Sequence, residues 1–246
     1  MAGALTTENS MNIFEKIHEQ FDIVWTKMYQ AMKIGAIAVI NIGDACRSFN
    51  HNFYLFPNAA RVTMGMLHAG FIPLPNIYWQ KPAKISGSGR PFLSSGFLPV
   101  NAYVTIDCEN ILIFRKGGLR KFVTQYDKNR REQSKFTIEQ RNKWFTQVWS
   151  DIRGARQEVI NGRKSAAFPD MIPERLIQMF SVIGDVVLDP FLGTGTTAIV
   201  ANKLHRSCIG IEIDKNIIDS KISVDKYDIS FTVKNTENEN DNIDEN

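Results

Sequence analysis

The stretch that decides the fold is Asp189-Pro190-Phe191-Leu192-Gly193-Thr194-Gly195-Thr196-Thr197. The apolar, β-branched run Asp185–Asp189 leads into it and is typical of a buried strand, while Thr196–Leu204 behind it has helical character. Gly193 and Gly195 allow a tight turn and a close approach of backbone to a ligand, and a helix N-terminus offers unpaired N–H groups. The stretch therefore predicts a strand–turn–helix ligand site in an α/β protein.

A carboxylate at the end of the next strand indicates the kind of ligand. Glu212 lies 23 residues after Asp189, in the strand predicted over Ser207–Ile213, where it can accept both hydroxyls of a ribose. The spacing Gly193-x-Gly195-x-x-Ala198 also matches the dinucleotide fingerprint, so a nicotinamide-dependent oxidoreductase is an alternative. The fixed charge of Asp189 would repel a pyrophosphate but suits an ammonium-bearing nucleoside, which favours S-adenosylmethionine.

Strands and helices alternate in the rest of the chain, which predicts a doubly wound, Rossmann-like α/β fold. Apolar residues at three- and four-residue steps predict a first helix over Ile13–Met32, capped at Asn9 or Ser10 and ended by Gly35. The other helices are expected at Pro57–Ala69, Pro169–Ser181, Thr196–Leu204 and Lys215–Ile222, and the other strands at Ala36–Ile42, Phe71–Trp79, Tyr103–Ile106 and Ile111–Arg115. The run Ala36–Ile42 is typical of a buried parallel strand.

The charge is distributed unevenly along the chain. Arg115–Lys164 holds 14 Lys and Arg against 5 Asp and Glu, whereas the last 12 residues hold 5 acids and no base. A basic middle favours a polyanionic partner such as duplex DNA, although a merely solvated face is the plainer interpretation. The candidate phosphate or base contacts are Lys81, Arg130, Arg131, Arg141, Lys143, Arg153 and Arg156. Trp144 and Trp149 fit either base stacking or the core.

Composition excludes several classes of protein. Apolar runs stay far below the roughly 20 residues of a membrane span, and the first ten residues lack the features of a signal peptide. The 3 cysteines and 4 histidines are scattered without metal-ligand spacing, so we expect neither a disulfide framework nor a metal site, and a cytoplasmic protein.

Several motifs together resemble one enzyme family. The stretch from Asp189 to Thr197 looks like motif I of the amino-group DNA methyltransferases, which modify N4 of cytosine or N6 of adenine. The order of the other blocks resembles the permuted β group, and the middle blocks are most similar to its CTAG-recognising N4-cytosine enzymes. These blocks are Ala166–Pro169 with Pro173–Ile177, Ala38–Ala45, Ile77–Lys81, Gly87–Gly89, Leu98–Pro99, Ala102–Thr105 and Ile111–Gly117.

The resemblance implies a site-specific methyltransferase of a restriction–modification system, with N4 of cytosine as the preferred target and N6 of adenine as the alternative. The resemblance and the turn together assign the cofactor to Phe168, Pro169, Asp189, Phe191, Gly193, Gly195, Thr196 and Glu212. The implied organisation is a methyltransferase domain over 10–116 and 165–233, a target-recognition insertion over 117–164, and a disordered acidic tail over 234–246.

One departure from the family concerns catalysis. The family's catalytic tetrapeptide contains a Pro-Pro pair followed by an aromatic residue, and this sequence has no Pro-Pro pair. No catalytic residue is therefore assigned. We expect a gap in the middle of the sheet, next to Ala36–Ile42, where the strand carrying that loop belongs. A separate polypeptide could supply the segment; the alternative is a DNA- or cofactor-binding subunit without activity of its own.

Overall fold

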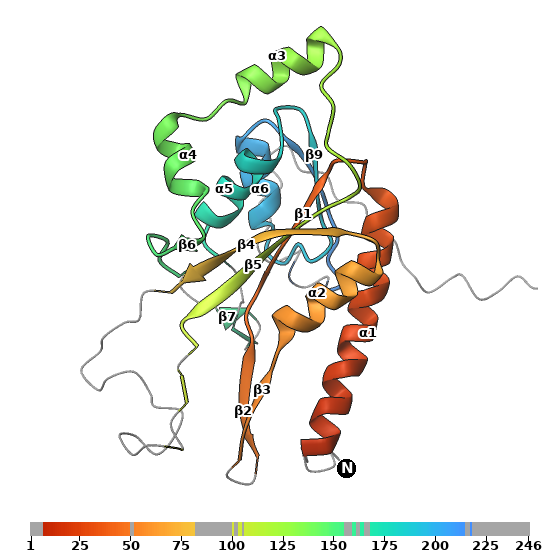
Figure 1. Cartoon of the computed structure of the whole chain (residues 1–246), viewed down its shortest axis with the longest axis vertical. Helices are drawn as coiled ribbons and strands as arrows, with labels where there is room; N and C mark the ends of the chain where they lie inside the picture. Colours follow the sequence, from red (N-terminus) through yellow and green to blue (C-terminus); the bar gives the residue numbers. More distant parts are fainter. Residues whose placement is uncertain are drawn as a thin grey trace, which may run out of the picture.

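The structure, a computed structural model, describes residues 7–49, 52–81, 100, 103–104, 106–154, 159–160, 163–164, 168–214 and 217. Helices and strands alternate along much of the chain (Figure 1). The helices are α1 (Thr7–Ala31), α2 (Asn58–His68), α3 (Gln125–Gln133), α4 (Ile138–Trp144), α5 (Met171–Phe180) and α6 (Thr196–Lys203). The strands are β1 (Ile37–Ile42), β2 (Ala45–Phe49), β3 (Asn52–Phe56), β4 (Ile72–Gln80), β5 (Cys108–Arg115), β6 (Val148–Trp149), β7 (Val159–Ile160), β8 (Arg163–Lys164), β9 (Val186–Asp189) and β10 (Ser207–Gly210).

The main sheet has the strand order β1-β5-β4-β6. Strand β5 runs antiparallel to both neighbours, with Ile37 and Ile72 each opposite Arg115, so β1 and β4 point the same way. The register of β4 shifts between Leu74 and Ile77, around Pro75, which has no N–H to give to the ladder. The second sheet is the parallel pair β10-β9.

Each face of the main sheet is covered by its own hydrophobic cluster. Helices α1 and α2 pack on one face, where Trp25, Val62 and Met66 meet Ala38 and Phe114. On the other face, the strand residues Ile77, Trp79, Ile111 and Ile113 pack with Trp144, Trp149, Ile152 and Ile172 of the insertion and α5. The result is a Rossmann-like sandwich in which the basic segment 117–164, the predicted insertion, contributes Trp144, Trp149 and Ile152 to the core.

The strands β1 and β9 begin at the same edge of the molecule. A Cβ on Gly35, just before β1, would lie 2.4 Å from the Arg120 backbone nitrogen, and the Arg120 guanidinium bonds Asp185, just before β9. Beyond β9, Phe191 contacts Phe21 and Trp25 of α1, the helix that packs along β1. We therefore call this edge, where both strands start, the amino edge, and the opposite edge the carboxyl edge.

Most elements expected from the sequence are present, and the differences have physical causes. Helix α1 already includes Asn9 and Ser10, so the predicted cap is wrong by about a turn. Strand β1 is antiparallel to its neighbour and, within the described ranges, pairs only with β5, so the prediction of a buried parallel strand is wrong. The described residues of Tyr103–Ile106 are not in a strand.

The sequence did not predict α3, α4 or the β2–β3 hairpin, which projects at the lower end of Figure 1. Apart from Ile217, the helix expected at Lys215–Ile222 and the acidic tail lie outside the described residues. Within the part of the chain that the structure describes, no helix is long and apolar enough to cross a membrane.

Candidate cofactor and DNA site

The turn after β9 has the conformation that its two glycines permit. The Asp189 Oδ1 atom accepts a hydrogen bond from the Phe191 N–H at 2.9 Å, which starts the turn. Gly193 and Gly195 have φ angles of 55° and 84°, in the left-handed region that side chains rarely adopt. Helix α6 then begins at Thr196 without a side-chain cap, which leaves its first N–H groups to a ligand.

Glu212 connects this turn to the end of β10. Its Oε2 atom accepts from the Gly193 N–H at 2.8 Å, and its Oε1 atom accepts from the Asp214 N–H at 2.9 Å. An ionised carboxylate has about four acceptor positions, so about two remain for the hydroxyls of a ribose. The same side chain thus shapes the turn and offers acceptors to a nucleoside.

Close packing fixes the distance between β10 and the turn. The Leu192 N–H donates to the Ile211 carbonyl at 2.9 Å, and a Cβ on Gly210 would stand 2.5 Å from the Leu192 side chain. Burial, and then the charge of Asp189, raise the pKa of the Cys208 thiol to about 11, which keeps it protonated and unreactive. This cysteine is therefore a packing residue.

Of the other predicted cofactor residues, Phe191 belongs to the turn itself, whereas Phe168 and Pro169 stand just before α5. Phe168 is partly buried against the core cluster on the insertion side of the main sheet, and the Pro169 carbonyl accepts from the Ile172 N–H at 2.9 Å at the start of α5. Phe191 is half exposed, with its ring 5.7 Å from Phe21 and 5.9 Å from Trp25. The structure thus brings Asp189, Gly193, Gly195, Thr196 and Glu212 together, with Phe191 in the same turn and its ring against α1.

Two basic side chains of the insertion, one of them a predicted DNA contact, bind a carboxylate of the protein itself. The Arg130 guanidinium donates to the Ile183 carbonyl and, at 2.6 Å, to Asp185, and its side chain is only 15% exposed. Arg120 donates to the same carboxylate at 2.5 and 3.0 Å. Burial opposes ionisation of Asp185, but the hydrogen bonds from Arg120 and the Val182 N–H outweigh it and lower its pKa. This cluster holds α3 at the amino edge.

A second carboxylate anchors the far end of the insertion. Asp151 accepts hydrogen bonds from both terminal nitrogens of Arg175, at 3.0 and 2.6 Å, and forms an ion pair with Lys143 at 2.9 Å. Arg175 is only 4% exposed, and its guanidinium also lies over the Trp149 ring. Hydrogen bonds from Arg175, and more weakly from Lys143, lower the pKa of Asp151 far below its ordinary value. Lys143, a predicted DNA contact, therefore also ties α4 to α5.

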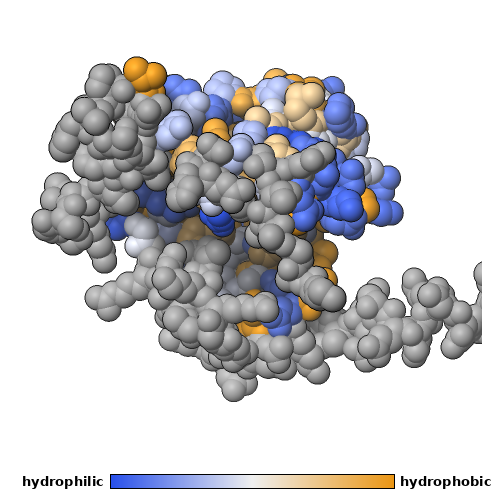
Figure 2. All heavy atoms as spheres, turned by 90° about the horizontal axis from the view of Figure 1, so that it is seen from below, coloured by the Kyte–Doolittle hydropathy of each residue, from blue (hydrophilic) through white to orange (hydrophobic). Residues whose placement is uncertain are grey.

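The remaining predicted contacts differ in exposure. Arg131 lies over the Phe122 ring at 4.7 Å, Arg141 and Arg153 are exposed, and Arg156 lies outside the described residues. Lys81 forms an ion pair with Glu109 at the carboxyl edge. Trp144 and Trp149 are 8% and 1% exposed and joined by a hydrogen bond, so both belong to the core and neither presents a face for base stacking. Seen from below, hydrophilic and apolar side chains are interspersed over the described residues (Figure 2).

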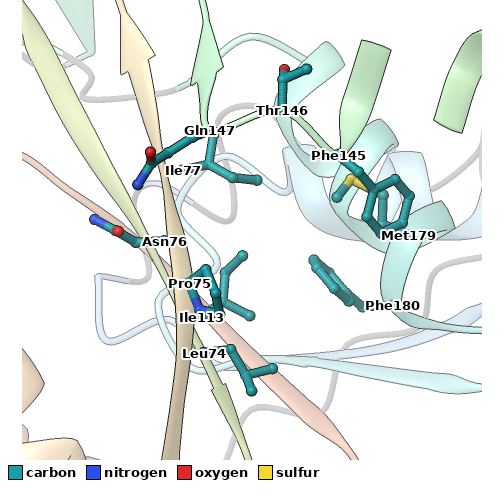
Figure 3. Close-up of a pocket in the computed structure, with 10 residues that line it drawn as sticks. All are labelled: Leu74, Pro75, Asn76, Ile77, Ile113, Phe145, Thr146, Gln147, Met179 and Phe180. Atoms are coloured by element: carbon teal, nitrogen blue, oxygen red, sulfur yellow. The ribbon is translucent and has the colours of Figure 1, made fainter. Parts of the chain in front are cut away.

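A separate cavity of about 420 Å³ lies between the irregular part of β4 and the end of α5. In Figure 3, Leu74, Ile77 and Ile113 from the strands face Phe145 and Phe180 across it. Its lining is mainly apolar and includes none of the predicted cofactor or DNA residues. The cavity is thus distinct from the glycine turn.

The fold and the turn define a Rossmann-like α/β protein with a nucleoside-type site, and comparisons identify its family. Residues 6–224 match the N6/N4 family described as DNA methylase. The chain is 48% identical over 217 residues to the type II methyltransferase M.MjaI of Methanocaldococcus jannaschii, covering 87% of this chain and 70% of that one. It is 40% identical over 222 residues to the type II methyltransferase M.MthZI of Methanothermobacter thermautotrophicus, covering 88% and 62%. The chain belongs to this DNA methylase family.

Solved structures agree with that assignment. A protein of Thermus thermophilus, assigned as a DNA modification methylase and solved with S-adenosyl-L-methionine, superimposes with a TM-score of 0.71 at 32% identity, covering 88% of this chain and 79% of that one. The cytosine-N4-specific PvuII DNA methyltransferase superimposes with a TM-score of 0.59 over 87% of this chain and 74% of its own, and its 19% identity supports the fold alone. The cofactor of the family is S-adenosylmethionine, and the oxidoreductase alternative is excluded.

Proposed function

We propose that this chain is a site-specific DNA methyltransferase of a restriction–modification system, which transfers a methyl group from S-adenosylmethionine to an exocyclic amine of a base. The observation that carries the proposal is the Glu212 carboxylate, bound to the Gly193 N–H with acceptor capacity to spare. M.MjaI and M.MthZI, both named type II methyltransferases, support the reaction class. N4 of cytosine is the preferred target, because the middle blocks resemble the CTAG-type enzymes of the permuted β group, and N6 of adenine is the alternative.

The cofactor fits the turn. S-adenosylmethionine supplies a methyl group made electrophilic by its sulfonium. Glu212 would accept the ribose hydroxyls, Asp189 would attract the positive charge of the amino acid part, and the two glycines leave room at the backbone. Phe168, Pro169, Phe191 and Thr196 complete the proposed cofactor set. The attacking amine needs no covalent bond to the protein, so catalysis would come largely from positioning.

The group that orients the amine belongs to a segment that this sequence lacks. Among the described residues, β1 pairs only with β5 and β9 only with β10, so each presents an unpaired edge. We propose that a strand carrying a Pro-Pro catalytic loop, on a separate polypeptide, pairs between these edges. A catalytically incomplete subunit or remnant is the second candidate function, and the same unpaired edges favour it.

Double-stranded DNA is the proposed partner, held mainly through phosphates. Residues 117–164 are proposed as the target-recognition insertion between the two parts of the methyltransferase domain, with the acidic tail as a separate segment. Arg130 forms an ion pair with Asp185, and Lys143 forms one with Asp151. These carboxylates neutralise part of the positive charge, so we expect Arg130 and Lys143 to attract phosphate less strongly than unpaired cations. Lys81, Arg131, Arg141, Arg153 and Arg156 are the other proposed contacts.

A methyl-transfer assay tests the proposal. The purified chain, with tritiated S-adenosylmethionine and unmethylated DNA, should bind the cofactor but transfer no label. Addition of a polypeptide that carries the Pro-Pro loop, from a neighbouring reading frame, should restore sequence-specific transfer. Label found on N6 of adenine would show that adenine, not cytosine, is the target. If the chain does not bind the cofactor, the proposed function is wrong.

A further inference from the structure

The two faces of the β9–β10 sheet differ in how they are covered. Val187 and Cys208 pack with residues of α5 and α6. Side chains alternate between the faces of a strand, so Val186 and Ile209 lie on the opposite face, where they are 62% and 57% exposed. The Ile211 N–H donates to the Asp189 carbonyl and continues the ladder beyond β10. We call this second face the open face; its side chains are Val186, Leu188, Ile209 and Ile211.

The open face lies on the same side of the molecule as α1. Helix α5 packs on the insertion side of the main sheet through Ile172 and on β9–β10 through Ile177. The open face therefore points to the other side, where α1 covers the main sheet. Phe191 lies at the boundary, because its ring contacts Phe21 and Trp25 of α1 while the residue is half exposed.

The flank of α1 that faces away from α2 is also apolar. Asp22 accepts hydrogen bonds from Arg61 of α2 and so marks the flank that faces α2. Ile13, Ile17 and Phe21 are spaced four residues apart and share another flank, which the ring contact of Phe21 turns toward the end of β9. Ile13 and Ile17 are both exposed. Two neighbouring elements thus present apolar side chains to solvent on one side of the molecule.

Such a surface indicates a missing layer of the fold. Parallel strands are normally covered on both faces by helices, and a contiguous exposed apolar surface marks a place where another polypeptide binds. The edge of β9 that is unpaired among the described strands borders the open face. A strand paired there continues into chain that passes next to this face. The match covers 70% of M.MjaI and 62% of M.MthZI, so both relatives contain further chain without a counterpart in it.

We propose that the open face binds an amphipathic helix, and that this helix belongs to the same polypeptide as the strand with the Pro-Pro loop. The inference rests on the proposed function, because that function supplies the polypeptide. The apolar side of the helix packs on Val186, Leu188 and Ile209 and against the exposed flank of α1, and its polar side faces solvent. A strand and loop alone would leave the open face in water, so the partner has to contain both elements.

The test uses the full chain with S-adenosylmethionine present and a fluorescently labelled fragment of M.MjaI that comprises the residues outside the match. Fluorescence anisotropy should show that the wild-type chain binds the fragment. Val186→Lys combined with Ile209→Lys should weaken binding about tenfold or more, because two charges would be buried under the helix. Ile138→Lys combined with Val148→Lys, at exposed positions of α4 and β6, is the matched control and should bind as wild type does. Cofactor binding by both variants checks that they fold.

A second readout does not depend on a variant. In the wild-type chain, the carbon-13 NMR signals of the Val186 and Ile209 methyl groups should shift with the fragment. They should not shift with a peptide limited to a Pro-Pro loop and its strand.

Several outcomes would overturn the inference. A chain that binds the cofactor but not the fragment, or fragment binding that survives the double variant, would do so. Self-association of the wild-type chain that the double variant abolishes would assign the open face to a second copy. Fragment binding that requires removal of residues 218–246 would assign it to this chain itself. Loss of cofactor binding by the wild-type chain would instead count against the proposed function.

Discussion

The polar groups at the amino edge and at the carboxyl edge of this molecule differ in whether their hydrogen-bond partners are present. At the amino edge, Asp185 accepts hydrogen bonds from Arg120, Arg130 and a backbone N–H, so both oxygens of its carboxylate have partners. At the carboxyl edge, Glu212 has acceptor capacity left over and Asn41 has a buried oxygen without a partner in the described residues. Folded proteins rarely leave buried polar groups unpaired without cause. At the amino edge these contacts hold residues 117–164 in place, and the spare acceptors at the carboxyl edge support the proposal that the cofactor binds there.

The largest expected effect concerns stability at the amino edge. Asp185→Asn removes the charge that pairs with Arg120 and Arg130, whose side chains are 35% and 15% exposed. The free energy of unfolding should fall by about 2–4 kcal/mol, because the charge-assisted hydrogen bonds from Arg120 and Arg130 to this carboxylate are lost. Urea unfolding measures the change. The control is Glu132→Gln, which breaks the exposed ion pair between Glu132 and Lys135. An equal loss in both variants would contradict the role given to this edge.

The anchor at Asp151 should have a smaller effect with a defined pH dependence. Its carboxyl is 37% exposed, so Asp151→Asn should cost about 1–2 kcal/mol at neutral pH after allowance for solvent screening. Because the folded-state pKa is lowered, the stabilisation is complete above the unfolded pKa of about 4 and is lost as the pH falls toward the lower folded value. Unfolding curves at pH 7 and pH 3 test this: the gap between wild type and variant should be full at pH 7 and narrower at pH 3. A gap that widens in acid would refute the assignment.

The smallest expected effect is on DNA affinity. Charge reversal of Arg130, Arg131, Arg141 and Lys143 together should flatten the salt dependence of duplex binding, since the log–log slope is about −0.9 per phosphate neutralised. Arg131→Glu with Arg141→Glu separates exposed cations from anchoring ones, and Lys81→Glu probes the carboxyl edge. Binding titrations between about 50 and 200 mM salt give the slopes. Affinity that does not change with salt would exclude phosphate binding by the insertion.

Local sequence signals predicted much of the fold and the glycine turn that is proposed to bind the cofactor. The spacing of apolar residues predicted α1, and the glycine turn with Glu212 was predicted because all of its determinants lie within one strand–turn–helix–strand unit. Helix α3 has no buried residue, so its sequence shows no apolar stripe. It is held by a Thr124 cap and by the contact of Arg130 with Asp185.

Contacts between residues far apart in the chain explain what was missed. Arg130 and Asp185 are 55 residues apart, and Asn41 and Glu109 are 68 apart. A basic residue in a basic segment looks like a DNA contact until its carboxylate partner is known. Likewise, Asn41 looked like part of a strand motif, and only the pairing of β1 with β5 brings it to Glu109. The sequence gives the number of charged residues, but it does not show which residues pair with one another.

The measurement that tests the contrast between the edges most directly is calorimetric titration of S-adenosylmethionine into Glu212→Gln and Asp185→Asn, with a thermal melt of each. The account predicts that Glu212→Gln weakens cofactor binding by about 2–4 kcal/mol, through lost charge-assisted hydrogen bonds, while its melting temperature stays closer to wild type. Asp185→Asn should melt lower and, where folded, bind the cofactor with unchanged affinity. Unchanged affinity in Glu212→Gln, given measurable binding by the wild-type chain, would contradict the account.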